Sequence, residues 1–360
     1  MDKNLLMSLN SKKFGLDVRG GELNYISHAH TDHSYALAQS TPIFCSDVTA
    51  SLLDLNGCAN TVKDTKDQDM YSSIGSSNLS NFSNKSSFNT SLNPIKKSKR
   101  RAKAQPVRVQ TPKEFKLQNA GHVLGSTQLY SDTCEFGRFV YTGDFKLRDG
   151  LTTKGASIID CDTLVIECTY GNPNVKFDAP AKVYDQMYAW HKRNKSSIQL
   201  WGGYSVGKAQ EIIKFLNDYA DQIPIVSKKI AHFSQKYVKN SMNLKFISSD
   251  SLEAKEIMRD GFCAVFSPNE LTRNFSWQIA QAHKRKTAVA FATGWTGIRR
   301  MHSDVSFGLS DHADFHEILT YAQESGAKQV FTAHGDNLAC AKALEKHGIN
   351  AHELSHIHSL

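Results

Sequence analysis

Apolar and polar positions along the chain follow the pattern of an α/β protein: short β-branched or aromatic runs separate stretches whose apolar residues recur three or four positions apart. The pattern predicts strands at residues 23–27, 42–45, 138–142, 163–167, 198–201, 288–292 and 329–332. It predicts helices at residues 46–56, 208–220, 271–284, 314–324 and 337–347. We therefore expect an α/β fold.

One segment departs from this pattern. Residues 71–100 contain ten serines and five asparagines with little apolar periodicity, and a lysine- and arginine-rich cluster follows at residues 96–103. Such composition cannot bury enough apolar surface to fold alone, so we expect residues 60–105 to form a flexible insertion. The basic cluster is either a solvated loop tip or an arm that follows a phosphate backbone.

Composition narrows the class of protein. With 360 residues, of which 40% are hydrophobic and 22% charged, the chain can form two domains with a sizeable core. It has no apolar run of membrane-spanning length, and the apolar part of its amino terminus is too short for a signal peptide. Seven scattered cysteines without a C-x-x-C pair indicate reduced thiols and a cytoplasmic location. The net charge of +8 suits a polyanionic partner such as nucleic acid.

Potential metal ligands are concentrated at the end of the predicted strand at residues 23–27, in the sequence Ser27-His28-Ala29-His30-Thr31-Asp32-His33. In an extended turn alternate side chains point the same way, so His28 and His30 can converge on one metal ion. Asp32 and His33 then face a second ion. Imidazole and carboxylate ligands suit zinc, with manganese or iron as alternatives.

Two further candidates lie where predicted strands meet loops. His122 is flanked by glycines in the sequence Ala120-Gly121-His122-Val123-Leu124-Gly125, and Asp144 ends the sequence Tyr141-Thr142-Gly143-Asp144. A carboxylate at the end of a strand can bridge two metal ions about 3.5–4 Å apart. The sequence therefore predicts a centre for two metal ions, most simply two Zn²⁺.

Asp17, the His28–His33 motif, His122 and Asp144 resemble the successive metal motifs of the metallo-β-lactamase superfamily. The resemblance implies an αβ/βα sandwich with a dinuclear site at one edge of its sheets. It assigns His28, His30 and His122 to one metal, Asp32, His33 and His334 to the other, and Asp144 to a bridging position. Asp17 is expected to support the histidine turn from behind the ligands.

The second half of the chain resembles the β-CASP nucleases within this superfamily. Glu167 in Ile166-Glu167-Cys168-Thr169 resembles motif A, His312 in Ser310-Asp311-His312-Ala313-Asp314 motif B, and His334 in Thr332-Ala333-His334-Gly335 motif C. The sequence Gly207-Lys208-Ala209-Gln210-Glu211 is similar to a helix-opening segment of the family. Together with Ala292-Thr293-Gly294-Trp295, these motifs resemble a short subgroup. It contains archaeal exonucleases of mRNA 3′-end processing and ligase-associated DNA exonucleases.

The resemblance also implies a domain organisation. Residues 1–175 form the first part of the metallo-β-lactamase domain, residues 176–300 a small inserted α/β β-CASP domain, and residues 301–360 the closing part. The catalytic residues that we expect are Asp32, Glu167 and His312. His312 acts as the general acid and Glu167 orients its ring, although His312 could also be a structural residue that caps a helix.

Substrate phosphates are expected at the start of the helix at residues 208–220, where free N–H groups and the Lys208 charge favour anions, with Ser205 and Gly207 beside them. Trp295 either stacks on a base or packs in the interior. Arg299 and Arg300 extend a basic wall or belong to a solvated loop. The carboxy-terminal His352, His356 and His358 are expected at the surface.

We therefore expect a metal-dependent nuclease that acts on single-stranded nucleic acid, with the histidine at motif C favouring RNA over DNA. A DNA exonuclease of end repair is the alternative with the same chemistry. A thioesterase or lactamase-like hydrolase shares only the first motifs and has no use for Glu167, His312 and His334. A nucleic-acid-binding scaffold subunit without activity is a further alternative.

Overall fold

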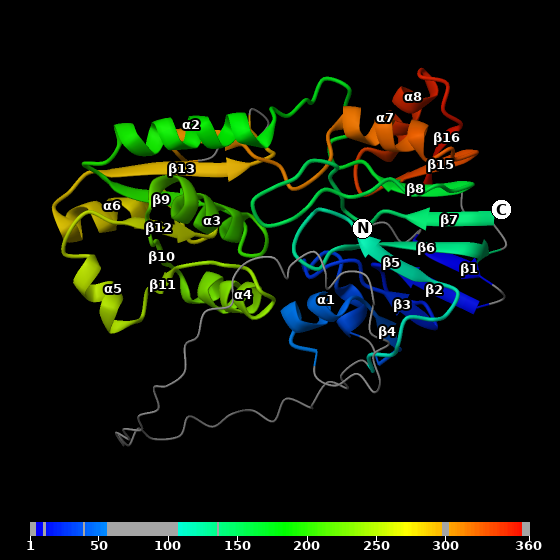
Figure 1. The fold of residues 1–360 in the computed structure, drawn as a ribbon, viewed down its shortest axis with the longest axis horizontal. Coiled ribbons are helices and arrows are strands. Elements are labelled where there is room, and N and C mark those ends of the chain that lie inside the picture. The colour runs from blue at the N-terminus through cyan, green and yellow to red at the C-terminus, as the bar shows by residue number, and fades with distance from the viewer. Residues whose placement is uncertain are drawn as a thin grey trace.

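The computed structural model describes residues 5–9, 12–38, 40–55, 107–134, 137–296 and 302–354. Figure 1 shows these residues in two lobes that lie side by side. The sandwich lobe holds the strands β1–β8, β15 and β16 with the helices α1, α7 and α8. The parallel-sheet lobe holds the strands β9–β14 with the helices α2–α6. The expected segment 60–105 lies outside the described residues.

The sandwich lobe contains two sheets. The four-stranded sheet has the order β1-β2-β3-β4, formed by Leu6–Leu9, Lys12–Leu16, Leu23–Tyr25 and Ile43–Phe44. The six-stranded sheet has the order β16-β15-β8-β7-β6-β5. In chain order its strands are Lys116–Asn119 (β5), Thr127–Cys134 (β6), Gly137–Tyr141 (β7), Thr163–Glu167 (β8), Gln329–Ala333 (β15) and Ala351–Glu353 (β16). The pairs β7/β8, β8/β15 and β15/β16 are parallel, so the carboxyl ends of these strands meet at one edge.

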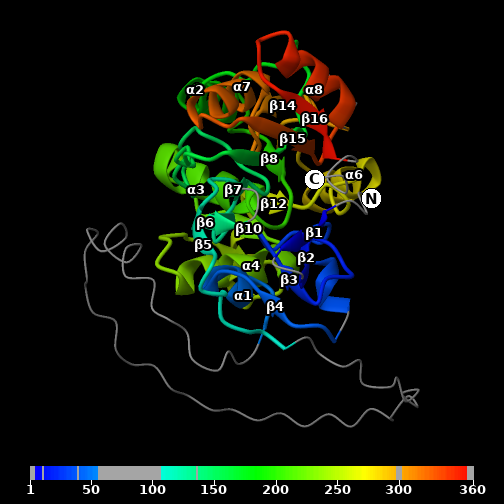
Figure 2. The same cartoon turned by 90° about the vertical axis from the view of Figure 1, so that its right-hand side faces the viewer.

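The two sheets pack face to face around a shared apolar core. Tyr25 and Phe44 of the four-stranded sheet meet Tyr141 and other buried residues of the six-stranded sheet in this core. Helices cover the outer faces, as Figure 2 shows with α7 and α8 at the top and α1 at the bottom. These helices are Asp47–Leu52 (α1), Phe315–Glu324 (α7) and Asn337–Glu345 (α8). The lobe thus has four layers, helix, sheet, sheet and helix.

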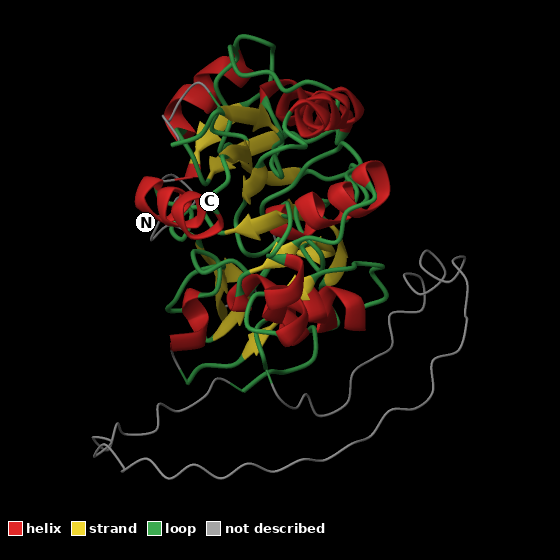
Figure 3. Ribbon diagram, turned by 90° about the vertical axis from the view of Figure 1, so that its left-hand side faces the viewer, coloured by secondary structure: helices red, strands yellow, loops and turns green. Residues whose placement is uncertain are grey.

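The sheet of the other lobe is entirely parallel, with the order β11-β10-β12-β9-β13-β14. Its strands are Ile198–Gly202 (β9), Ile225–Val226 (β10), Ile247–Ser248 (β11), Cys263–Phe266 (β12), Thr287–Thr293 (β13) and Val305–Gly308 (β14). Its helices are Pro180–Arg193 (α2), Lys208–Ala220 (α3), Lys228–Lys239 (α4), Leu252–Ile257 (α5) and Arg273–His283 (α6). Helices α2–α4 pack on one face and α5 and α6 on the other, and Figure 3 shows helices on both sides of the strands.

The mixed α/β fold confirms the expected fold class, and each strand predicted from the pattern coincides with an observed strand to within a few residues. The predicted helices correspond to α1, α3, α6, α7 and α8. Strand β14 pairs with β13, so the third sheet extends to Gly308.

No helix in the described part of the chain is long and apolar enough to cross a membrane.

Candidate metal centre

The polar side chains of the centre come from the ends of strands. The histidine motif follows β3, His122 lies between β5 and β6, Asp144 follows β7, and Glu167 is the last residue of β8. His334 follows β15, and His312 lies between β14 and α7. Because β7, β8 and β15 are parallel neighbours, their carboxyl ends bring residues distant in sequence to one edge. The topology of the sandwich lobe therefore positions the centre.

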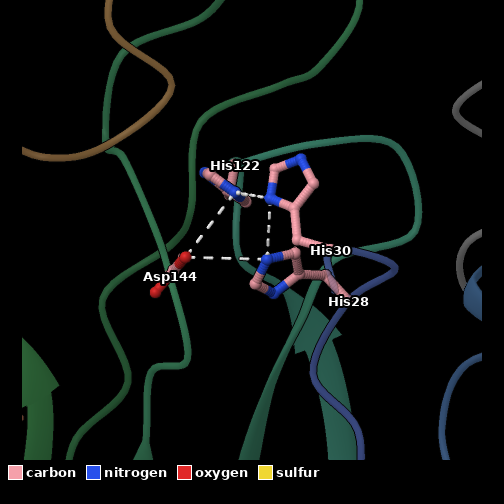
Figure 4. Close-up of side chains that lie close together, drawn as sticks. All are labelled: His28, His30, His122 and Asp144. Atoms are coloured by element: carbon pink, nitrogen blue, oxygen red, sulfur yellow. Dashed lines mark hydrogen bonds and ion pairs between the residues drawn. The ribbon is translucent and has the colours of Figure 1, made fainter. Parts of the chain in front are cut away.

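The first group consists of His28, His30, His122 and Asp144, whose potential ligand atoms lie within 4.8 Å of one another (Figure 4). His30 Nδ1 lies 3.0 Å from His28 Nε2 and 3.1 Å from His122 Nε2. Asp144 Oδ2 lies 3.6 Å from His28 Nε2 and 3.7 Å from His122 Nε2. Burial lowers the pKa of all three histidines, so they are neutral, as metal-binding imidazoles must be.

In each imidazole of the first group, one nitrogen faces the other ligands and the outer nitrogen points away from them. The hydrogen-bond partner of the outer nitrogen fixes the tautomer of the ring. His30 Nε2 lies 3.1 Å from the Val206 carbonyl and His122 Nδ1 lies 2.9 Å from the Asp311 carbonyl, so each nitrogen carries the proton and donates it. His28 Nδ1 lies 2.9 Å from Ser27 Oγ, whose own proton goes to Asp17 Oδ2 at 2.5 Å. The three nitrogens that face one another therefore all present lone pairs.

The second group consists of Asp17, His33 and His334. Asp17 is buried and accepts hydrogen bonds from the backbone N–H of Ser27, from Ser27 Oγ and, at 2.8 Å, from the Tyr141 hydroxyl. Its Oδ2 also lies 2.9 Å from His33 Nδ1. Although burial alone lowers the pKa of His33, the carboxylates of Asp144 and Asp17 raise it well above its ordinary value.

Tyr141 links Asp17 and His334, two members of the second group. Its hydroxyl donates to Asp17 and lies 2.7 Å from His334 Nε2. A tyrosine inside a sheet needs a partner for its hydroxyl, and this one holds two members of the group at once. No motif in the sequence gave Tyr141 a role, although it ends an apolar strand three residues before Asp144.

The third group joins Asp144 to Glu167 and His312. His312 Nδ1 lies 3.0 Å and 3.1 Å from the two oxygens of Glu167 and 3.9 Å from Asp144 Oδ2. Glu167 is fully buried and accepts from the backbone N–H of Phe145 at 2.8 Å. Burial alone lowers the pKa of His312, but the charges of Glu167 and Asp144 raise it to about 9. The ring is thus held by Nδ1 in a cationic form, with Nε2 as the second acidic nitrogen.

The donor set of the first group fits a divalent cation. The three nitrogens and the Asp144 oxygen are 3.0–3.7 Å apart along the measured edges. In a tetrahedral zinc site with bonds of about 2.0–2.1 Å the edges are about 3.4 Å. Asp144 Oδ1 is buried without a hydrogen-bond partner. Facing lone pairs beside an orphaned carboxylate oxygen are unfavourable unless a cation lies between them.

Other residues singled out in the sequence are not members of these groups. Asp32 is exposed, and among the described residues it belongs to none of the three groups. Ser205 is nearly buried, and its carbonyl accepts from Gln210. The Gly207 N–H donates to the Gln210 side chain at 2.8 Å. Lys208 is buried, with its ammonium 2.8 Å from Asp311 Oδ1, so its charge faces carboxylates in the interior.

Trp295 packs against Tyr170, with ring centroids 5.2 Å apart, and Tyr170 in turn contacts His312 at 5.9 Å. His352 is exposed. Arg299, Arg300, His356 and His358 lie outside the described residues.

The loop that carries His312 is held by residues to which the sequence motifs gave no role of their own. Arg148 donates to the His312 carbonyl at 3.2 Å and pairs with Glu317 at 2.9 Å. Ser310 Oγ accepts from the His312 N–H at 3.0 Å. Asp311 stands in motif B, but its carbonyl could be paired with His122 only once the fold brought together two residues 189 positions apart.

Comparison with known proteins finds similarity to an RNase, an RNase J-like protein and a DNA ligase. The chain is 26% identical over 267 residues to a probable RNase MJ4 and 25% identical over 215 residues to an RNase J-like protein, both of Methanocaldococcus jannaschii. It is 27% identical over 241 residues to a probable DNA ligase of Opitutus terrae. These matches cover 68%, 57% and 65% of this chain. Similarity to proteins named as RNase or RNase J-like supports the metallo-β-lactamase superfamily, which the histidine and aspartate motifs resemble.

The same matches cover only part of the relatives, namely 55%, 45% and 23% of their lengths. No family model matches the chain. Among solved structures, a protein of unknown function from Enterococcus faecalis V583 superimposes with a TM-score of 0.52 at 11% identity. That match covers 87% of this chain and 75% of the other, and it shows a shared fold.

Proposed function

We propose that this protein is a metal-dependent nuclease that hydrolyses phosphodiester bonds of single-stranded RNA, in the manner of an exonuclease. The four-layer sandwich lobe is then the metallo-β-lactamase domain, and the parallel-sheet lobe is an inserted β-CASP domain of the short subgroup. The observation that carries the proposal is the sharing of Asp144: it belongs to the imidazole group and also to the Glu167–His312 group. The cation site and the Glu167–His312 pair, which would supply a proton, thus share the Asp144 carboxylate.

Metal ions bound here, two Zn²⁺ or alternatively Mn²⁺ or Fe²⁺, would supply Lewis acidity towards water and phosphate oxygens. His28, His30 and His122 would hold one ion, and His33 and His334 the other, with Asp144 between them. Asp32 remains the expected further ligand and catalytic residue, and Asp17 holds His33 and the turn from behind. The imidazoles of His28, His30 and His122 are neutral and their outer nitrogens are occupied, so these three are prepared to bind a cation without rearranging.

His312 performs the proton transfer in this proposal. Glu167 accepts from Nδ1 and keeps the ring cationic, so Nε2 can donate a proton to the leaving oxygen of the nucleotide. Glu167 is fully buried and additionally held by the Phe145 N–H, so it orients the ring and leaves proton donation to His312. A hydrolase of thioesters or lactams has no need for this second carboxylate–histidine pair, which supports a nuclease.

Single-stranded nucleic acid is the proposed partner, since two of the relatives are named as RNases or RNase J-like and the chain carries a net charge of +8. The match to a probable DNA ligase favours one second candidate, a DNA exonuclease that prepares ends for joining. Both candidates use the same residues and differ only in the sugar that the site accepts.

A time course on single-stranded RNA and DNA of identical sequence, each labelled at the 5′ end and with Zn²⁺ or Mn²⁺ added, tests the proposal. We expect RNA to be shortened, and His312→Ala to slow this by about 10²–10⁴-fold through loss of the general acid. Metal content, measured by elemental analysis, should stay near that of the wild type in His312→Ala and fall in Asp144→Asn.

The matched control is His352→Ala, which removes an exposed histidine that belongs to none of the three groups and should leave the rate unchanged. Cleavage of DNA alone would replace the first candidate with the second. Failure to cleave either strand with the metals bound would contradict the nuclease proposal.

A further inference from the structure

The parallel-sheet side of the molecule supplies the outer contacts of two metal-group histidines. His30 donates to the carbonyl of Val206, which lies in the loop between β9 and α3. His122 donates to the carbonyl of Asp311, which lies in the loop between β14 and α7. Both loops leave strands of the parallel sheet, whereas both histidines belong to the sandwich lobe. The tautomers of His30 and His122 therefore depend on how the lobes dock.

One buried cation ties these two loops together. Lys208 follows Val206 by two residues, and its Nζ lies 2.8 Å from Asp311 Oδ1 and 2.5 Å from Glu211 Oε2. The side chain of Lys208 is only 2% exposed and that of Asp311 only 11%. Lys146 of the sandwich lobe approaches the same Asp311 oxygen at 3.6 Å. Such an enclosed pair holds its partners firmly, because separating them leaves an unpaired buried charge.

The backbone at Gly207 shows how closely the loop is seated. Gly207 has φ +87°, and a Cβ added there would lie 2.4 Å from Val123 Cγ1, in the residue that follows His122. It would also lie 3.3 Å from Asp311 Oδ2. Only glycine permits this approach, so Val206, Asp311 and the His122 segment form one packed unit.

We propose that Lys208 is a positioning residue: its ion pair with Asp311 holds the Val206 and Asp311 carbonyls on His30 and His122, and so couples metal affinity to the docking of the two lobes. The inference rests on the metal-binding part of the proposed function. It concerns the outer contacts of the ligands, and it needs neither substrate nor turnover to be tested.

The test measures zinc affinity of the metal-stripped full chain by competition with a chromophoric chelator. Lys208→Met removes the cation, and Asp311→Asn weakens the same pair while keeping the backbone carbonyl and leaving Lys208 paired with Glu211. We expect each to weaken binding at one zinc site by about 10–100-fold, the usual effect of losing an outer partner of a metal ligand. The double variant should bind zinc no more weakly than the single variants, because both substitutions break the same Lys208–Asp311 ion pair.

The control is Lys236→Met. Lys236 is also a buried lysine that joins the lobes, but it donates to the Leu52 carbonyl at the end of α1, away from the centre. We expect its zinc affinity to equal that of the wild type. Unchanged affinity in folded Lys208→Met and Asp311→Asn, or an equal loss in Lys236→Met, would overturn the inference. A wild-type chain that binds no zinc would overturn the proposed function as well.

A measurement on the unaltered chain covers the case in which the variants do not fold. Hydrogen–deuterium exchange is followed with and without zinc. The inference expects zinc to slow exchange at residues 203–212 and 309–313 more than in the rest of the parallel-sheet lobe. Equal exchange in both states would contradict it.

Discussion

Two residues of the centre hold backbone conformations that side chains rarely adopt. Asp17 has φ +57° and His334 has φ +58°. Aspartate and histidine enter this left-handed region more readily than most residues, but each still costs on the order of 1 kcal/mol. The Tyr141 hydroxyl contacts both side chains, so the hydrogen-bond network that faces the centre also maintains the strained turns.

The contribution of Glu211 to the free energy of unfolding depends on pH, and this dependence can be measured in the protein without metal. Burial alone raises the pKa of Glu211, but the nearby Lys208 and Lys146 together lower it below its ordinary value of 4.5. A carboxylate with a lowered folded-state pKa stabilises the fold above its unfolded pKa, and that contribution is lost as the pH falls. Glu211→Gln should therefore cost about 3 kcal/mol near neutral pH, and the difference from wild type should shrink as the pH falls from about 5 to about 2.

Urea unfolding over this pH range measures the effect. Glu253→Gln is the control, because Glu253 is exposed on α5 and its substitution should change the free energy of unfolding by less than about 0.5 kcal/mol. A Glu211→Gln difference that does not vary with pH would contradict the assigned ion pair.

Single residues were predictable from the sequence where chemistry and spacing coincide. His28, His30, His122 and Asp144 are gathered as their motifs suggest, because each follows a strand of the same sandwich. The hydrogen-bond partners that fix the tautomers of these histidines could not be predicted from the sequence. The Val206 carbonyl is 176 positions from His30, and a backbone carbonyl carries no signal of residue type.

At the scale of elements, the residues at the start of α7 both stabilise this helix and hold the loop that carries His312. Asp314 caps this helix by accepting from the Glu317 N–H at 3.1 Å, and it also pairs with Arg148, which holds the His312 carbonyl. Asp314→Ala should destabilise the protein by about 1–2 kcal/mol through the lost cap and also lower nuclease activity, because His312 is two residues away.

Thr272→Ala provides the comparison. Thr272 caps α6 in the same manner, accepting from the Phe275 N–H at 3.2 Å, but lies in the parallel-sheet lobe away from His312. We expect a similar loss in thermal denaturation and no loss of activity. Equal loss of activity in both variants would indicate that general destabilisation, and not the position of His312, is responsible.

Two elements that the pattern did not predict show why local sequence was insufficient. Helix α4 has the sequence KKIAHFSQKYVK, whose buried face includes the polar residues Ser234 and Lys236, and β12 is a run of only four buried residues. Short apolar runs do not distinguish a strand from part of a helix. Both elements are stabilised by packing in the parallel-sheet lobe, which local sequence does not reveal.

At the scale of the molecule, one apolar cluster reaches from the parallel-sheet lobe into the sandwich lobe. Leu52 of α1 and Leu124 belong to the same buried cluster as Ile230 of α4 and Trp201 of β9. Lobes that share a core should unfold together, so we expect one cooperative transition in calorimetry. Leu52→Ala should lower the stability of the whole molecule by about 2–5 kcal/mol without splitting this transition.

Leu338→Ala is the matched substitution, since Leu338 is 47% exposed on α8 and should contribute little. Two separate transitions in the wild type, or a Leu52→Ala effect confined to one of them, would contradict the shared core.

The chain leaves the sandwich lobe after β8 and returns at α7, and these two points are neighbours: Tyr170 and Asp314 form an isolated parallel bridge. A whole module can therefore begin and end at adjacent positions without altering the order of the strands that carry the centre. The length of the segment between these two residues is therefore free to vary while every ligand-bearing strand keeps its place. Within that segment, only the loops that carry Val206 and residues 311–312 must return to the same positions at the centre.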